Sequence, residues 1–200
     1  MAWSSRGYQH RPELRRAEAE ELPQMFVEEL EALGGHGVRV GSLEEAREYV
    51  LSLAREVGAK LVIRWDEPYL EELGADEPLK EAGVGVSVWG EGEDAREQAA
   101  RADIGLSTAE YAVAETGSLV VCSGVGAGRS VTLLPPTYVA VVPAGRVVSG
   151  VADVIRAYAG RGELPSGLCF HTGPSRSADI EQSLAIGVHG PGDVHVVLVG

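Results

Sequence analysis

Residues 38–65, VRVGSLEEAREYVLSLAREVGAKLVIRW, contain the pattern from which the fold class is predicted. Both ends of this stretch are short β-branched runs, which are typical of strands, and apolar residues recur at helical spacing between them. Ser42 followed by Glu45 is a capping-box pattern that begins a helix, and Gly58 is a favourable residue for its end. The stretch therefore predicts a strand, a helix over 43–57 and a second strand over 60–65.

The same alternation extends in both directions along the chain. Apolar residues over 22–33 recur at helical spacing and stop at Gly34, so we expect an amphipathic helix there. An acidic, turn-rich segment over 66–83 precedes a strand over 84–89 and a helix over 93–101. Strands that alternate with helices predict an α/β fold, with three α/β/α layers around a mostly parallel sheet.

The second half of the chain has strand patterns in closer succession, separated by Gly- and Pro-containing turns. They lie at 103–107, 117–123, 138–143, 167–171 and 194–199, with one clear helix over 151–158. We expect these strands to make the sheet a mixed one. The predicted organisation is an N-terminal helical extension over 1–35 and one α/β domain over 36–200.

Charge and cysteine content exclude several classes of function. The chain has 30 acidic and 17 basic residues, a net charge of −13, which argues against nucleic acid or an anionic membrane as a partner. No apolar run is long enough to span a bilayer, and residues 1–21 lack the apolar core of a signal peptide, so we expect a cytoplasmic protein. Cys122 and Cys169 lie in apolar runs and are expected to be reduced; two cysteines are too few to hold an iron–sulfur cluster.

Two loops that follow predicted strands carry candidate chemistry. In the first, Glu115 is the single acid of an apolar stretch beside Thr116 and Gly117, a setting that suits proton transfer or nucleophilic attack on an acyl group. The alternative is an ion pair that closes the end of a sheet. The second, SGVGAGRS over 123–130, matches neither a dinucleotide nor a Walker loop, because Arg129 stands where each needs another residue. It is a flexible lid or a backbone nest with Arg129 facing an anion, or else a mobile loop without a ligand.

The third loop, HTGPSRSADIE over 171–181, is dense in small polar residues and glycine. Ser175 or Ser177 can cap a helix whose first turn carries two acids, and the helix start with Arg176 suits a carboxylate or phosphate. In the alternative interpretation the cap is structural and Arg176 pairs with those acids. The acids are Asp179 and Glu181, and Thr172 and Gly173 are the further candidate ligand contacts.

Three histidines lie in or after this loop. The separations between His171, His189 and His195 are 18 and 6 residues, which match no metal-site spacing, so no metal ligand is assigned. His195 alternates with valines and is expected in a strand. His189 lies on a loop, where it joins Glu115 as the candidate for proton transfer.

Taken together, these segments resemble the lactate utilisation protein C family, whose members carry an LUD domain. The matching motifs are ADIG (102–105), AETGSL (114–119), LLPP (133–136), GPSRSADIE (173–181) and GVHGP (187–191). They cover the second half of the chain. The resemblance implies a fold similar to ribose-5-phosphate isomerases and CoA transferases, and a role in oxidising L-lactate to pyruvate with two iron–sulfur partner proteins. Clusters are then expected in the partners, and no cofactor is expected on this chain alone.

Three hypotheses of function remain. In the first, the chain is a cluster-free component of a lactate-oxidising assembly and binds a small carboxylate such as lactate through Arg176. In the second, it is a stand-alone acyl-transfer or phosphosugar-type enzyme that uses Glu115, with the loops around Gly126 and Arg176 holding an anionic substrate. In the third, it is a scaffold that docks partners on the acidic face of its N-terminal helices.

Overall fold

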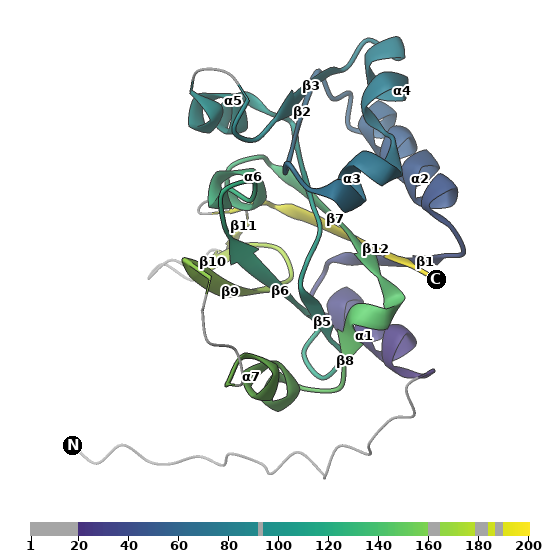
Figure 1. The fold of residues 1–200 in the computed structure, drawn as a ribbon, viewed down its shortest axis with the longest axis vertical. Coiled ribbons are helices and arrows are strands. Elements are labelled where there is room, and N and C mark those ends of the chain that lie inside the picture. Colours follow the sequence, from purple (N-terminus) through teal and green to yellow (C-terminus); the bar gives the residue numbers. More distant parts are fainter. Residues whose placement is uncertain (1–19, 92–93, 160–164, 179–183, 187–189) are drawn as a thin grey trace, which may run out of the picture.

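The computed structural model describes residues 20–91, 94–159, 165–178, 184–186 and 190–200. Within these residues six parallel strands form the central sheet, in the order β1-β12-β7-β4-β2-β3 (Figure 1). The strands are β1 (His36–Val40), β12 (Asp193–Val199), β7 (Thr137–Pro143), β4 (Ile104–Ser107), β2 (Leu61–Arg64) and β3 (Gly85–Val88). The predicted α/β fold with a mostly parallel central sheet is therefore confirmed.

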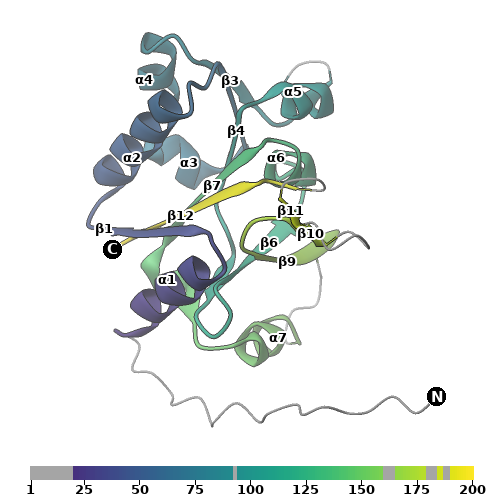
Figure 2. The ribbon, with the colours of Figure 1, turned by 180° about the vertical axis from the view of Figure 1, so that it is seen from behind.

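Helices cover both faces of this sheet (Figures 1 and 2). One layer contains α2 (Leu43–Glu56), α3 (Pro68–Leu73) and α4 (Asp76–Glu81). The other contains α1 (Leu22–Ala32), α5 (Ala95–Arg101) and α6 (Arg129–Leu133). Successive residues of β1 face the two helical layers in turn. His36 lies on the face covered by Tyr49 of α2, whereas a side chain at Gly37 would contact Val27 of α1.

A second sheet packs beside the central one and holds strands that the sequence pattern assigned to a single mixed sheet. Its order is β8-β5-β6-β9, with β6 antiparallel to both of its neighbours. The strands are β8 (Val147–Val148), β5 (Tyr111–Val113), β6 (Ser118–Ser123) and β9 (Gly167–Thr172), and a 3₁₀ turn, η1 (Ala144–Arg146), precedes β8. Helix α7 (Val151–Ala159) buries Val154 and Tyr158 against Val113 and Val120 of this sheet.

The N-terminus of α2 forms nearly as predicted. The Ser42 hydroxyl accepts the amide of Glu45 at 3.2 Å, while the Glu45 carboxylate accepts the amide of Gly41 at 2.7 Å. In the capping box the carboxylate binds the amide of the cap residue itself, so the reciprocal bond is displaced by one residue here. A cap of this kind stabilises a helix by about 1 kcal/mol.

Two local predictions, by contrast, are wrong. The acidic segment over 66–83 is not a run of turns, because it contains α3 and α4, whose leucines (Leu70, Leu73 and Leu79) are buried. The helix expected to begin at Ser175 or Ser177 does not form there. Instead β10 (Arg176–Ala178) pairs antiparallel with β11 (Leu184–Ile186). This pairing gives backbone amides of β10 hydrogen-bond acceptors, whereas the first amides of a helix have none within the helix.

Helix α1 contributes Phe26 and Leu30 to the large core beneath the central sheet. A division of the chain at residue 35 stays a prediction. No helix among the described residues has the length and apolarity needed to cross a membrane.

Candidate functional site

Glu115 lies in the turn of the β5–β6 hairpin, which is held between α1 and the loop before α7. Its amide donates to the carbonyl of Ser149 at 3.0 Å, and its carboxylate lies so close to Gly150 that a side chain at that position would clash with it. Gly117 has φ = 59°, and a Cβ there would lie 2.6 Å from the amide nitrogen of Leu30. A glycine is therefore required for the turn to approach the backbone of α1.

Four of the predicted ligand contacts come together at this turn: Thr116, Gly117, Thr172 and Gly173. Thr116 Oγ1 donates to Ser118 Oγ at 2.8 Å, and that hydroxyl lies 2.8 Å from Thr172 Oγ1 on the adjacent strand. Gly173, with φ = 68°, packs against Leu33 at the end of α1. Because these hydroxyls bond to one another, they tie β6 to β9.

The Gly-rich loop over 124–128 is docked on the carboxyl ends of β2 and β3. The amide of Asp66 donates to the carbonyl of Gly126 at 2.9 Å, and the indole of Trp65 donates to the carbonyl of Gly128 at 3.0 Å. Side chains at these two glycines would clash with Asp66 and with the ring of Trp89. The glycines therefore permit close packing of this loop against the ends of the two strands, and an anion facing Arg129 stays a prediction.

Arg129 follows that loop and lines a pocket between α5 and α6. Arg96 of α5 lines the same pocket, whose volume is about 370 Å³; its other lining residues are Ser130, Leu133 and Leu134. Within the described part of the chain, neither guanidinium has a hydrogen bond or ion pair. Trp65 and Trp89 contact Gly128, the residue before Arg129, so the N-terminus of α6 lies at the carboxyl ends of β2 and β3, the edge at which open α/β sheets bind ligands.

The arginine pair is well suited to a small anion. A guanidinium offers a planar fork of donors that matches a carboxylate or phosphate, and two of them in one pocket supply two such forks. Arg129 was predicted from the sequence, but Arg96 was not. Nothing in the pattern of α5 distinguishes Arg96 from a solvated helix residue, and only the packing of α5 against α6 brings it to Arg129.

A smaller cavity of about 120 Å³ lies across Leu133 from this pocket, near the amino ends of β7 and β12. It is lined by Leu133, Tyr138, His171, Gly173, Ser175, Gly190, Pro191 and Val194. His171 packs edge-on against Tyr138 with ring centroids 6.0 Å apart, and burial lowers the pKa of His171, which favours its neutral form. The amide of Ser175 donates to the carbonyl of Pro191 at 2.9 Å. Ser175 thus lines the same small cavity as His171 rather than standing at a helix start.

The remaining predicted site residues lie outside what the structure describes. Asp179, Glu181 and His189 fall in its gaps, and for Arg176 only the backbone of β10 is described. Their roles stay predictions.

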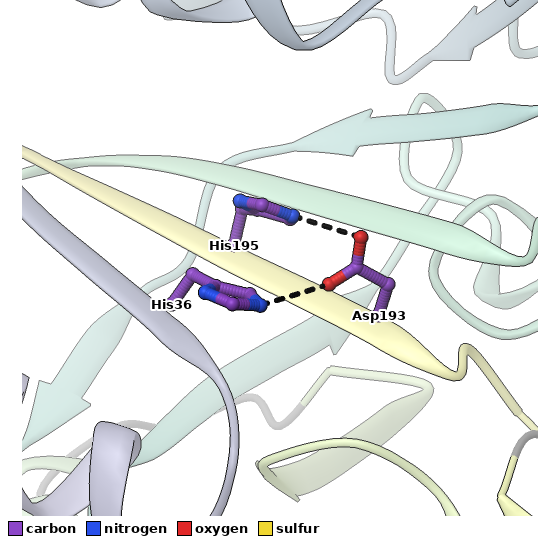
Figure 3. Close-up of side chains that lie close together, drawn as sticks. All are labelled: His36, Asp193 and His195. Atoms are coloured by element: carbon purple, nitrogen blue, oxygen red, sulfur yellow. Dashed lines mark hydrogen bonds and ion pairs between the residues drawn. The ribbon is translucent and has the colours of Figure 1, made fainter. Parts of the chain in front are cut away.

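A further cluster was not found from the sequence: His36, Asp193 and His195, at the amino ends of β1 and β12 (Figure 3). His36 Nε2 lies 3.4 Å from one carboxylate oxygen of Asp193, and His195 Nε2 lies 2.9 Å from the other. The imidazole rings stack with centroids 4.6 Å apart. The Tyr49 hydroxyl lies 2.7 Å from His195 Nδ1, and burial, with a smaller contribution from the charge of Asp193, raises the pKa of Tyr49.

Comparison with known proteins assigns this chain to a family. The LUD domain model matches residues 23–199, and the chain belongs to the LUD-domain family. Within it, the similar curated proteins are named Lactate utilization protein C, which confirms the predicted family. The protein of that name from Halalkalibacterium halodurans is 43% identical over 157 residues, covering 76% of this chain and 67% of the relative. The one from Bacillus subtilis is 37% identical over 169 residues, covering 80% and 69%.

A solved structure agrees with the fold. A DUF162 family protein from Deinococcus radiodurans superimposes with a TM-score of 0.60 at 20% identity, over 92% of this chain and 99% of that one. The similarity supports the architecture described above. The alignments to the two curated relatives, by contrast, span about two thirds of their length.

Proposed function

We propose that this chain takes part in lactate utilisation, as a component of a system that oxidises L-lactate to pyruvate with iron–sulfur partner proteins, and that it binds a small carboxylate between Arg96 and Arg129. The observation that carries the proposal is this pair of guanidinium groups, which have no partner among the described residues, in a chain whose relatives are named for lactate utilisation.

The electrostatics of the chain favour this pocket over the rest of its surface. With a net charge of −13, most of the surface repels small anions. Two arginines that pair with no carboxylate in the described part of the chain reverse that sign locally. Leu133 and Leu134, which are 39% and 42% exposed, give the pocket an apolar wall that suits the methyl group of lactate.

The cysteines support a division of labour with partner proteins. The chain has two cysteines, Cys122 on β6 and Cys169 on β9, and both are free thiols. Cys122 Sγ lies 3.0 Å from the hydroxyl of Tyr158, inside the small apolar cluster under α7. Since a cluster needs about four thiolates, we assign the electron-carrying clusters to the partners.

Glu115 as the nucleophile of a stand-alone enzyme receives less support. Its turn lies before β6, whereas Arg129 and the Gly-rich loop follow that strand. A six-residue strand separates its ends by about 20 Å, so Glu115 and Arg129 are too far apart to hold one small substrate.

Replacing Arg129 or Arg96 by glutamine is expected to weaken the binding of L-lactate by about 10-fold or more, because each change removes a charge-assisted hydrogen bond. Isothermal titration of the full chain with L-lactate measures the effect, and growth of the corresponding strains on L-lactate shows whether it matters in cells. The matched control is Arg101→Gln, because Arg101 lies on the same helix but pairs with Glu97. Equal affinities for the wild-type chain and both pocket variants would refute the carboxylate site.

The partner proposal has a separate test. The tagged chain, recovered anaerobically from its native cells, is expected to bring down proteins that contain iron and acid-labile sulfide in stoichiometric amounts. A colourless chain without partners, under conditions in which a control complex survives, would contradict this part of the proposal and leave the anion site to its own experiment.

A further inference from the structure

We infer that His36, Asp193 and His195 bind one divalent transition-metal ion, with two imidazole nitrogens and one carboxylate as ligands. This inference is independent of the carboxylate proposal. The cluster lies at the amino ends of β1 and β12 (Figure 3), on the face of the sheet that α2 covers. The arginine pocket lies between α5 and α6 on the other face.

The strand pairing itself brings the three ligands together. His36 and His195 are register partners on the adjacent parallel strands β1 and β12, so their side chains point to the same face. Asp193 lies two residues before His195 and therefore shares that face. The sheet fixes the backbone of all three residues, and a site on strands is more rigid than one on loops.

The distances suit a single ion. Bonds of about 2.0–2.2 Å to nitrogen and oxygen place the ligand atoms of one ion roughly 3–3.5 Å apart. The carboxylate of Asp193 is already 3.4 Å from His36 Nε2 and 2.9 Å from His195 Nε2, and all the donor atoms lie within 4.8 Å of one another. To bind one ion, the two stacked imidazole rings, whose planes are 20° apart, must tilt toward each other so that both Nε2 lone pairs point at it.

The donor set indicates the class of ion. Two imidazoles and one carboxylate are the protein ligands of open zinc sites and of non-haem iron(II) sites, in which water or substrate completes the coordination. The side chains of His36 and Asp193 are 60% and 37% exposed, so the remaining positions face solvent. This site is therefore open rather than a closed structural one.

Tyr49 supplies the orienting contact that such sites commonly have. A histidine that binds a metal through Nε2 usually donates its Nδ1–H to a neighbouring acceptor, which fixes the tautomer and the ring orientation. The hydroxyl of Tyr49, 2.7 Å from His195 Nδ1, is in position to accept that hydrogen bond. His195 has 8% of its side chain exposed and is held in place, while His36 completes the site from the solvent side.

The test uses the full chain without an affinity tag, stripped with a chelator and titrated calorimetrically with Zn²⁺. We expect one ion per chain, affinity more than about 100-fold weaker in His36→Gln and Asp193→Asn, and affinity about 10–100-fold weaker in Tyr49→Phe. His171→Gln is the matched control, because this histidine lines the small cavity away from the cluster. With Co²⁺, the wild-type chain should show a visible d–d spectrum without the charge-transfer band of a thiolate.

Folding and binding are separated by a second readout. Because His36 is exposed, His36→Gln should melt at the wild-type temperature in chelator, and Zn²⁺ should raise the melting temperature of the wild-type chain alone. If the wild-type chain binds no stoichiometric Zn²⁺, or if His36→Gln and Asp193→Asn bind it as tightly as the wild type, the three residues are only a hydrogen-bonded network and the inference is overturned.

Discussion

Replacing Asp76 by alanine is expected to lower the free energy of unfolding by about 3 kcal/mol, because it leaves the buried guanidinium of Arg64 without its counter-charge. Arg64 lies at the end of β2 and is 7% exposed. Its Nε and Nη2 donate to the carboxylate of Asp76 at 2.8–3.1 Å, and Nη1 donates to the carbonyl of Trp65. Burial opposes the charged form of Arg64, but the hydrogen bonds and charge of Asp76 outweigh it and raise the pKa of Arg64.

Urea denaturation of Asp76→Ala measures this loss. The neighbouring Glu77→Ala is the control, since Glu77 pairs with Lys80 on the surface and such pairs contribute about 0–1 kcal/mol. The double variant Arg64→Met, Asp76→Leu should recover much of the stability, because it removes both charges together. Equal destabilisation by Asp76→Ala and Glu77→Ala would contradict the prediction, because it would mean that solvent stabilises the charge of Arg64 as well as Asp76 does.

Replacing Gly105 by alanine is expected to destabilise the chain by about 3 kcal/mol and to displace α6. Gly105 lies in the middle of β4, where α6 crosses the sheet. A methyl group there would overlap the carbonyl oxygen of Val131 and lie 3.1 Å from the ring of Pro135. Since the obstacle is backbone, no side-chain rotation relieves it.

The same substitution should also weaken L-lactate binding, because α6 carries Arg129 into the pocket. Thermal or urea unfolding gives the stability, and titration with L-lactate gives the affinity. Gly124→Ala is the control: no atom lies within 4 Å of a Cβ at that position, so its stability should change by less than about 0.5 kcal/mol. A Gly105→Ala chain as stable as Gly124→Ala would show that α6 adjusts without cost.

The part of the fold that could be predicted from the sequence is the part determined by local signals. Ser42, Glu45 and Gly58 mark the two ends of α2, and β-branched runs mark the strands beside it. The second sheet could not be predicted in the same way, because β6 pairs with β9 across a long stretch of chain that includes β7 and α7. At β10 the local signals for a helix start are present, but pairing with β11 overrides them.

In the candidate site, too, residues with a local sequence signal could be predicted, whereas residues that only the packing brings together could not. Arg129 was identified by its Gly-rich loop, although the glycines serve to pack against Asp66 and Trp89. Arg96 carries no local signal. His36 and His195 were missed as a pair because they stand at opposite ends of the sequence. A histidine opening the first strand and an Asp-x-His opening the last strand is the signal that could have found the cluster, once those strands are known to be neighbours.

The position of β12 between β1 and β7 has a consequence for biosynthesis. β1 is the first strand to be synthesised, but its partner in the central sheet is β12. It therefore has no strand to pair with until residues 193–199 have left the ribosome. The edge of β7 that β12 later covers is also open during that time. Nascent chains therefore carry β1 unpaired for most of translation, and the edge of β7 stays open from the end of that strand at Pro143 until β12 is made, a state that favours aggregation.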